Sequence, residues 1–218
     1  MQSLSLIQEL SIAILPVILA ITVHEAAHGL AADKLGDRTA RLAGRVTLNP
    51  FKHIDPLGTV ILPLAMYALS GFMFGWAKPV PVNWRNLGQP RRDTALVAIA
   101  GPLANFGMLL FWSVMLAVPG FLSLNEWIGV PLFLMAQYGI LINAVLMALN
   151  LLPLLPLDGG RVLNSLLPVK LATIFSKTEP WGLLIMIGLL VSGLLQKILG
   201  PAIDILKHLS VQIAGILL

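Results

Sequence analysis

The chain has 218 residues, of which 57% are hydrophobic and 11% are charged. A soluble domain usually carries about 25% charged residues, so a chain with this composition and a mean hydropathy of +0.89 cannot cover a water-facing exterior, and we expect membrane embedding. The net charge of +4 comes from basic residues in the short breaks between apolar runs, which is typical of cytoplasmic loops beside anionic lipid and does not indicate a nucleic-acid partner.

The first apolar segment, residues 3–32, is long enough to span a membrane and ends in an ionisable motif. No A-x-A-like cleavage site follows residues 1–20, so we expect the segment to be retained and not removed as a signal peptide. Its last turns carry the sequence HEAAH, residues 24–28. Ionisable side chains within a membrane segment are costly and usually functional.

The HEAAH motif predicts a metal site. In an α-helix, His24 and His28 lie one turn apart on one face, and Glu25 lies at the edge of that face. Two imidazoles at this spacing can share one zinc ion, which lowers the pKa of its water to about 7, and the adjacent carboxylate can take the proton from that water. The sequence therefore predicts His24 and His28 as zinc ligands and Glu25 as the general base. The alternatives are a chance match to the motif, or a helix end where polar residues meet the membrane interface.

A basic stretch at 33–56 follows the first segment. Within it, the sequence TARLAGRVTLNP (39–50) alternates in places and contains a glycine. This pattern predicts a short membrane-associated β-hairpin that pairs residues 38–43 with 45–48. The alternative is an irregular basic loop.

The next apolar segment, 57–76, is interrupted by Pro63 and Gly71 and has basic stretches on both sides. Under the positive-inside rule, both flanks face the cytoplasm. We therefore expect a re-entrant hairpin or a pair of half-helices at 57–76, in contact with protein or a water-filled cavity, and not a full crossing.

Three further segments, at 94–118, 129–152 and 181–199, are also long enough to span the membrane. The final piece, 201–218, carries its polar residues on one helical stripe, and we expect an interfacial amphipathic helix or a poor last span. We predict a single integral-membrane domain over residues 1–218. Its expected fold class is an all-α polytopic membrane protein, with about four to six transmembrane helices around a three-helix catalytic core.

A catalytic zinc needs a third protein ligand, and the absence of cysteine leaves only histidines and carboxylates. His53 and His208 lie in a basic loop and in the amphipathic tail, where we expect them to be hydrated. Asp158 differs because it ends the apolar run NLLPLLPLDGGR (150–161), in which two prolines break the helix and a Gly-Gly pair lets the chain turn back toward the bundle. The alternatives are that Asp158 caps the following helix or pairs with Arg161.

Three motifs in this order carry a resemblance to a known family: HEAAH (24–28), GPLAN (101–105) and NLLPLLPLDGG (150–160). They resemble those of the site-2 protease family of intramembrane zinc metalloproteases, in particular its small prokaryotic members without a PDZ or CBS domain. The resemblance covers roughly residues 20–185, and it implies that the predicted domain is an integral-membrane metalloprotease.

The resemblance also implies roles for individual residues. It implies one Zn²⁺ ion with three ligands, His24, His28 and Asp158. It also implies that Glu25 is the general base. It further implies that Asn150 and Asn105 contact the substrate. We expect Asn143, which shares a helix face with Asn150, to serve as a packing partner.

The function implied by the resemblance is hydrolysis of peptide bonds within or near the transmembrane helices of membrane-anchored proteins. The expected partners are a transmembrane substrate protein and membrane lipid, and the expected location is the prokaryotic cytoplasmic membrane, as a multi-pass protein. A membrane metal-binding or metal-transport protein is the alternative, but it leaves Glu25 without a role.

The directions of the segments give an independent expectation. His24 and Asp158 lie near the C-terminal ends of segments 3–32 and 129–152, so these two segments must run in the same direction to share a metal. That requires an odd number of full crossings between them, which supports a re-entrant 57–76. It also places the active site toward the cytoplasmic side.

Overall fold

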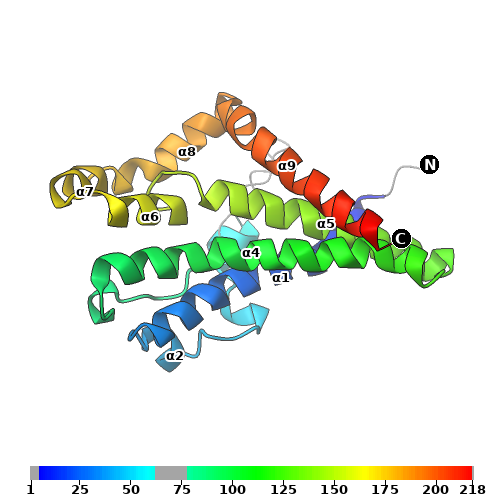
Figure 1. Ribbon diagram of the computed structural model, residues 1–218, viewed down its shortest axis with the longest axis horizontal. Helices are drawn as coiled ribbons and strands as arrows, with labels where there is room; N and C mark the ends of the chain where they lie inside the picture. The colour runs from blue at the N-terminus through cyan, green and yellow to red at the C-terminus, as the bar shows by residue number, and fades with distance from the viewer. Residues whose placement is uncertain (1–4, 62–77, 218) are drawn as a thin grey trace.

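Every regular element in the described part of the chain is helical. The computed structural model describes residues 5–61 and 78–217 (Figure 1). Three long helices form the centre of the bundle: α1 (Leu6–Lys34), α4 (Pro90–Phe121) and α5 (Glu126–Asn150). Together with the helical stretch Val169–Val191, they are the four candidates for membrane spans among the described residues, by length and hydropathy. The predicted all-helical polytopic class is therefore confirmed.

Helix α4 packs against both α1 and α5 and runs in the opposite direction to both, as the colour order in Figure 1 shows. Helix α4 begins beside the end of α1. Just before α4, the backbone N–H of Gly88 donates to the carbonyl of Leu35, which follows α1, at 3.2 Å. A short turn at residues 122–125 reverses the chain into α5. The C-terminal ends of α1 and α5 therefore lie toward the same end of the bundle, as a shared metal site requires.

The shorter described elements follow the long helices or connect them. The helices are α2 (Thr39–Leu42), α6 (Asp158–Leu166), α7 (Val169–Ser176), α8 (Gly182–Val191) and α9 (Leu194–Ile216). Single 3₁₀ or π turns lie at Pro50–Lys52, Pro56–Ile61, Trp84–Asn86 and Glu179–Trp181.

The last two helices divide the chain differently from the predicted segments 181–199 and 201–218. Gly193 has a φ of +70°, a left-handed conformation that glycine adopts readily, and the chain turns there between α8 and α9. Helix α9 therefore begins before residue 201. It folds back along α4 and α5, and Leu195 and Leu199 are buried in a cluster with Ala148 of α5 (Figure 1).

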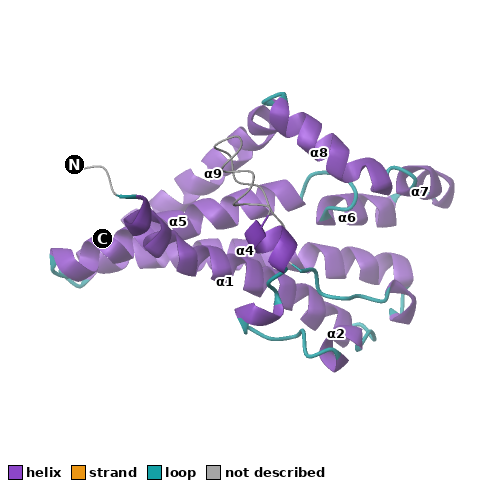
Figure 2. Ribbon diagram, turned by 180° about the vertical axis from the view of Figure 1, so that it is seen from behind, coloured by secondary structure: helices purple, strands orange, loops and turns teal. Residues whose placement is uncertain are grey.

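The hairpin predicted at 38–48 is wrong, and no strand occurs in the described part of the chain (Figure 2). The buried carboxylate of Asp37 accepts hydrogen bonds from the backbone N–H and the hydroxyl of Thr39, which begins the short helix α2 in place of a strand. Gly44, with a φ of +63°, follows that helix. Local hydrogen bonds to the Asp37 side chain thus outweigh a weak alternation pattern.

Most of the segment predicted to be re-entrant, 57–76, lies outside the described residues. At its start, Pro56–Ile61 form a single π-helical turn. The two flanks meet, because the backbone N–H of Lys78 donates to the carbonyl of His53 at 3.0 Å.

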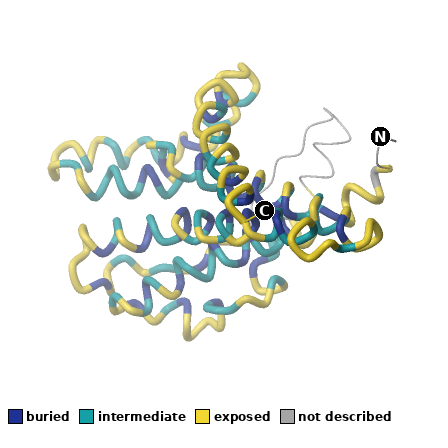
Figure 3. The backbone as a smooth tube through the Cα atoms, turned by 45° about the vertical axis from the view of Figure 1, so that its right-hand side comes forward, coloured by how far each residue is buried: buried dark blue, intermediate teal, exposed yellow. Residues whose placement is uncertain are grey.

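The burial pattern is that of a helical bundle surrounded by lipid (Figure 3). Large apolar side chains such as Phe111, Phe121 and Trp127 are exposed, whereas Asn105 and Asn143 are completely buried between the helices. In lipid an apolar exterior is stable, but buried polar side chains must find partners within the protein. Three of the buried polar side chains, His24, Asn105 and Asn143, are hydrogen-bonded to one another.

Candidate metal centre

Three side chains that are able to bind a metal converge where α1 meets the start of α6. His24 and His28 extend from α1, and Asp158 opens α6. The two Nε2 atoms are 3.0 Å apart, and each lies 3.3 Å from Asp158 Oδ2. Within residues 5–61 and 78–217, this is the one group of three such side chains close enough to hold a metal ion. The structure thus brings together the three residues predicted to bind zinc.

The other ring nitrogen of each imidazole is hydrogen-bonded. His24 Nδ1 lies 2.6 Å from the side-chain oxygen of Asn105, and His28 Nδ1 lies 2.8 Å from the carbonyl oxygen of Val97. A carbonyl oxygen only accepts, so each Nδ1 carries the ring proton and each Nε2 of the neutral ring presents a lone pair. Two lone pairs and a carboxylate oxygen therefore face one another, an arrangement that a cation stabilises.

The spacing of these atoms fits zinc. Nitrogen and oxygen ligands lie about 2.0 Å from a tetrahedral Zn²⁺ and therefore about 3.3 Å from one another. The three separations of 3.0, 3.3 and 3.3 Å agree with that edge length. Asp158 Oδ2 is also buried without a hydrogen-bond partner in the described structure, as expected of an oxygen that binds a metal. Two imidazoles and one carboxylate leave a fourth position open, which is typical of catalytic zinc sites.

Two glycines allow the backbone to come close to these ligands. A Cβ on Gly101 of α4 would lie 2.4 Å from His28 Nε2 and 2.6 Å from His24 Cε1, so a side chain there would displace the imidazoles. A Cβ on Gly159 would lie 2.3 Å from the Leu151 carbonyl oxygen, so the first turn of α6 packs tightly on the loop before it. Both glycines belong to motifs found in the sequence, GPLAN and LDGG.

Glu25 faces a different part of the molecule from the histidines. Its Oε2 accepts a hydrogen bond from the backbone N–H of Val80 at 2.8 Å. Val80 lies between Pro79 and Pro81, and because proline has no N–H and favours an extended chain, Val80 supplies the one backbone donor of residues 79–81. The extended segment 78–83 therefore orients the predicted general base.

Arg45 holds the start of this extended segment. Its buried guanidinium donates through Nη2 to the carbonyl oxygens of Lys78 and Pro79, at 2.7 and 3.3 Å. These two carbonyls immediately precede the Val80 N–H that binds Glu25. Arg45 thus fixes the position of the donor from one residue away.

Asp37 holds the other end of the segment. Its carboxylate accepts from the backbone N–H of Asn83 at 2.7 Å and from the side chain of Asn86 at 2.9 Å, in addition to Thr39. Burial raises the pKa of the Asp37 carboxyl, but the hydrogen bonds from Thr39, Asn86 and Asn83 outweigh burial and hold that pKa below its ordinary value. The charged form of Asp37 is therefore the form that ties segment 78–83 to the end of α1.

Asn105 lies behind His24 and has its partners inside the bundle. Its Oδ1 accepts from His24, and its Nδ2 donates to the Ala20 carbonyl at 3.2 Å and to Asn143 Oδ1 at 2.9 Å. Asn105 is completely buried, and its observed partners are His24, Ala20 and Asn143; its contact with the substrate stays a prediction. No sequence pattern indicated the hydrogen bond between Asn105 and Asn143, which lie 38 residues apart.

The remaining predicted residues lie outside this network. Asn150 is half-buried in the last turn of α5, where its Nδ2 donates to the Leu146 carbonyl at 3.0 Å. His53 is buried, contrary to expectation, with Nε2 2.9 Å from the Thr47 carbonyl, and His208 is exposed on α9.

The alternative roles considered for Asp158 are not observed. The residue before it, Leu157, occupies the N-cap position of α6. Arg161 pairs instead with Glu179 at 3.0 Å.

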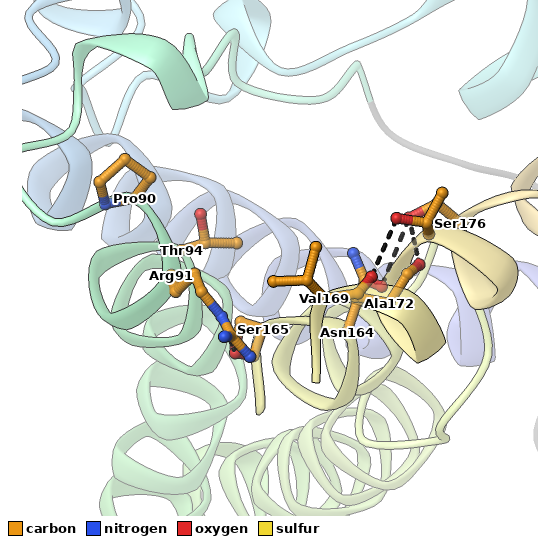
Figure 4. A pocket seen from close by; sticks show the side chains of 9 residues that line it. Pro90, Arg91, Thr94, Asn164, Ser165, Val169, Ala172 and Ser176 are labelled. Carbon is orange, nitrogen blue, oxygen red and sulfur yellow. Dashed lines mark hydrogen bonds between the residues drawn. The ribbon is translucent and has the colours of Figure 1, made fainter. Parts of the chain in front are cut away.

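A cleft of about 360 Å³ lies between the start of α4 and the helices α6 and α7 (Figure 4). Its walls include Thr94 of α4, Ser165 of α6 and Thr173 of α7, so they are partly polar. Thr94 precedes Gly101 by seven residues, and Ser165 follows Asp158 by seven, which places each pair on one helix face about 10 Å apart. The cleft is therefore aligned with the metal centre along two helices.

Comparisons with known proteins agree with this arrangement. The family model for Peptidase family M50 matches residues 128–193, a range that includes Asp158. "Putative zinc metalloprotease YwhC" of Bacillus subtilis (strain 168) is 36% identical over 201 residues, which cover 88% of this chain and 85% of YwhC. "Putative zinc metalloprotease Rip2" of Mycolicibacterium smegmatis is 29% identical over 189 residues, 83% of this chain and 66% of Rip2.

A second Rip2 protein, that of Mycobacterium tuberculosis, is 30% identical over 149 residues, which cover 67% of this chain and 54% of Rip2. The chain therefore spans most of YwhC but only about half to two thirds of the Rip2 proteins. No solved structure gives a significant match.

Proposed function

The chain belongs to peptidase family M50, the site-2 protease family of zinc metalloproteases, and we propose that it hydrolyses peptide bonds within or near the transmembrane helices of membrane-anchored proteins. The observation that carries this proposal is the convergence of His24, His28 and Asp158, with the two histidines on a helix long and apolar enough to span a membrane. A site of this kind inside a bundle of such helices gives access to peptide bonds that lie in the membrane.

In the proposed mechanism, His24, His28 and Asp158 hold one zinc ion. When bound, zinc supplies a Lewis acid for the scissile carbonyl and lowers the pKa of a coordinated water to about 7. Glu25 takes a proton from the attacking water and returns it to the leaving nitrogen as the C–N bond breaks. The Val80 N–H keeps the Glu25 carboxylate oriented for both transfers.

Substrate binding is assigned to the extended segment 78–83 and to Asn150. A transmembrane helix hides its peptide bonds in intrahelical hydrogen bonds, so a substrate must present an unwound strand. We assign the pairing of that strand to the extended segment 78–83, by β-augmentation, since the hairpin expected at 38–48 does not form. Asn150, at the end of α5, is assigned to the substrate backbone.

The proposed setting is a prokaryotic cytoplasmic membrane, with the end of α1 toward the cytoplasm. The basic stretches that flank residues 57–76 support this orientation under the positive-inside rule. Hydrolysis needs water at the metal centre, and the partly polar cleft beside Thr94 and Ser165 provides an entry at this end of the bundle.

The test compares the wild type with Glu25→Gln. Glutamine keeps the size of the side chain and still accepts from Val80, but it cannot take a proton from water. Each protein is co-expressed in membranes with a panel of tagged single-span proteins, and fragments are followed on immunoblots. We expect fragments from the wild type and a rate about 10²–10⁴-fold lower for Glu25→Gln, with equal zinc content in the two purified proteins. Equal processing by both would refute the mechanism and favour a metal-binding or metal-transport role.

A further inference from the structure

A chain of buried amides connects three helices to one metal-binding histidine. Asn143 of α5 bonds to Asn105 of α4, and Asn105 bonds to His24 of α1. We propose that Asn143 is a positioning residue for the metal centre, which acts through Asn105 to fix the tautomer and the orientation of His24. This inference rests on the proposed function, because it takes His24 as a zinc ligand.

The orientation of each amide follows from a backbone carbonyl at the far end of the chain. The Gly139 carbonyl, 2.8 Å from Asn143, only accepts, so it must meet the Nδ2 of Asn143. The Oδ1 of Asn143 therefore points toward Asn105 and accepts a hydrogen bond from Asn105 Nδ2. Asn105 Nδ2 also donates to the Ala20 carbonyl oxygen at 3.2 Å, which requires the same orientation of the Asn105 amide.

The consequence reaches the metal-binding atom of His24. With Nδ2 of Asn105 turned toward Asn143 and Ala20, its Oδ1 is turned toward His24 Nδ1 and accepts the ring proton at 2.6 Å. The lone pair of His24 is therefore on Nε2, the atom that faces Asp158. A reversed Asn143 amide would set oxygen against oxygen at Gly139 and break this order.

Because these hydrogen-bonded side chains are buried, their orientations are fixed. Asn105 and Asn143 have no exposed surface, and His24 has very little. In a bundle with an apolar exterior, no water replaces a missing partner, so each amide depends on the next. His28 differs, because its Nδ1 is held directly by the Val97 backbone carbonyl and needs no side chain behind it.

Outer partners of metal-binding histidines typically contribute 10-fold to 100-fold to metal affinity. Asn105 touches His24 directly, so we expect Asn105→Leu to weaken zinc binding by the larger factor. For Asn143→Leu we expect the smaller factor, about 10-fold, because the Ala20 carbonyl still holds one N–H of Asn105.

The experiment measures zinc dissociation constants on detergent-solubilised full-length protein, by competition with a chromophoric chelator, with no substrate present. The variants are Asn143→Leu, Asn105→Leu and the double variant. Ser113→Ala is the matched control, since Ser113 is a fully buried polar residue whose Oγ also donates four residues back along its own helix, to Leu109. The visible spectrum of the Co²⁺-loaded proteins reports the ligand geometry in parallel.

A positioning role predicts a specific pattern. Asn143→Leu raises the zinc dissociation constant about 10-fold and changes the Co²⁺ spectrum, Ser113→Ala changes neither, and the double variant binds zinc no more weakly than Asn105→Leu alone. Wild-type affinity in Asn143→Leu overturns the proposal, and so do strictly additive losses in the double variant.

A second variant covers the case in which Asn143→Leu does not fold. In Asn143→Asp the buried carboxyl is neutral, so its O–H donates to Gly139 and its other oxygen accepts from Asn105, and we expect zinc affinity within about 3-fold of the wild type. A larger loss in a folded Asn143→Asp overturns the proposal. Because every readout is metal binding, a wild type that binds zinc as described but cleaves nothing would refute the proposed function and leave this inference standing.

Discussion

His24 and Glu25 are neighbours in the sequence, but two different regions of the molecule hold them. Behind His24 lies a chain of side-chain amides, completely buried between three long helices. Beside Glu25 lies the extended segment 78–83, which contacts it through one backbone N–H. Arg45 and Asp37, both in loops, hold this segment by hydrogen bonds. The difference follows from helix geometry, because successive residues point about 100° apart.

This division suits the two tasks. A metal ligand has to stay within a fraction of an ångström of its position, which packed helices ensure. A general base has to meet a water first and a leaving nitrogen later, and a carboxylate held by a single N–H retains the freedom to do so. We therefore expect changes in the helical interior to weaken metal binding, and changes in the loop region to lower the catalytic rate of a zinc-loaded enzyme.

The largest expected effect is that of Gly101→Ala, which acts on the interior alone. Its methyl group would lie 2.4–2.7 Å from atoms of His24 and His28, and the packed helices leave the rings nowhere to move. We expect the zinc dissociation constant to rise by about 100-fold or more, measured by chelator competition. Gly107→Ala is the matched control, because an added Cβ there meets nothing within 4 Å on the same helix. Equal zinc binding by the two variants would show that the interior is not rigid.

Arg45→Ala acts on the loop region alone and should give a smaller effect of a different kind. Without the guanidinium on the carbonyls of Lys78 and Pro79, the Val80 N–H no longer holds Glu25 in one place. We expect kcat to fall about 10-fold to 100-fold, with zinc content unchanged.

The controls for Arg45→Ala come from the same loop. Lys52→Ala removes an exposed cation and should leave kcat unchanged, whereas Arg45→Lys should fall between the wild type and Arg45→Ala. Loss of zinc from Arg45→Ala would mean that the two regions are not separable.

The two regions also differ in how far the sequence predicts them. The apolar segments and the HEAAH spacing are local patterns, so they predict the long helices and the direction of His24 and His28. Asp158 was identifiable because prolines and glycines interrupt an apolar run at its position. The sequence patterns did not reveal the tie of Val80 to Glu25, which spans 55 residues, or that of Asn143 to Asn105. The predicted hairpin failed where one buried carboxylate, Asp37, accepts a hydrogen bond from the first residue of a short helix.

The smallest expected effect is a pH-dependent change in melting temperature, which distinguishes the loop region beside Glu25 from the helical interior behind His24. The amides behind His24 do not titrate. Segment 78–83, in contrast, is held at its C-terminal end by the Asp37 carboxylate. The pKa of Asp37 in the folded protein is below its ordinary value of 3.8. A lowered folded-state pKa means that Asp37 stabilises the fold above pH 3.8 and loses this contribution as the pH falls through its lower folded value. Asp37→Asn should therefore lower the melting temperature at pH 7 by about 2–4 °C and by less at pH 3, when both proteins are followed by tryptophan fluorescence. A melting-temperature difference that is the same at both pH values would show that the charge of Asp37 does not hold the segment.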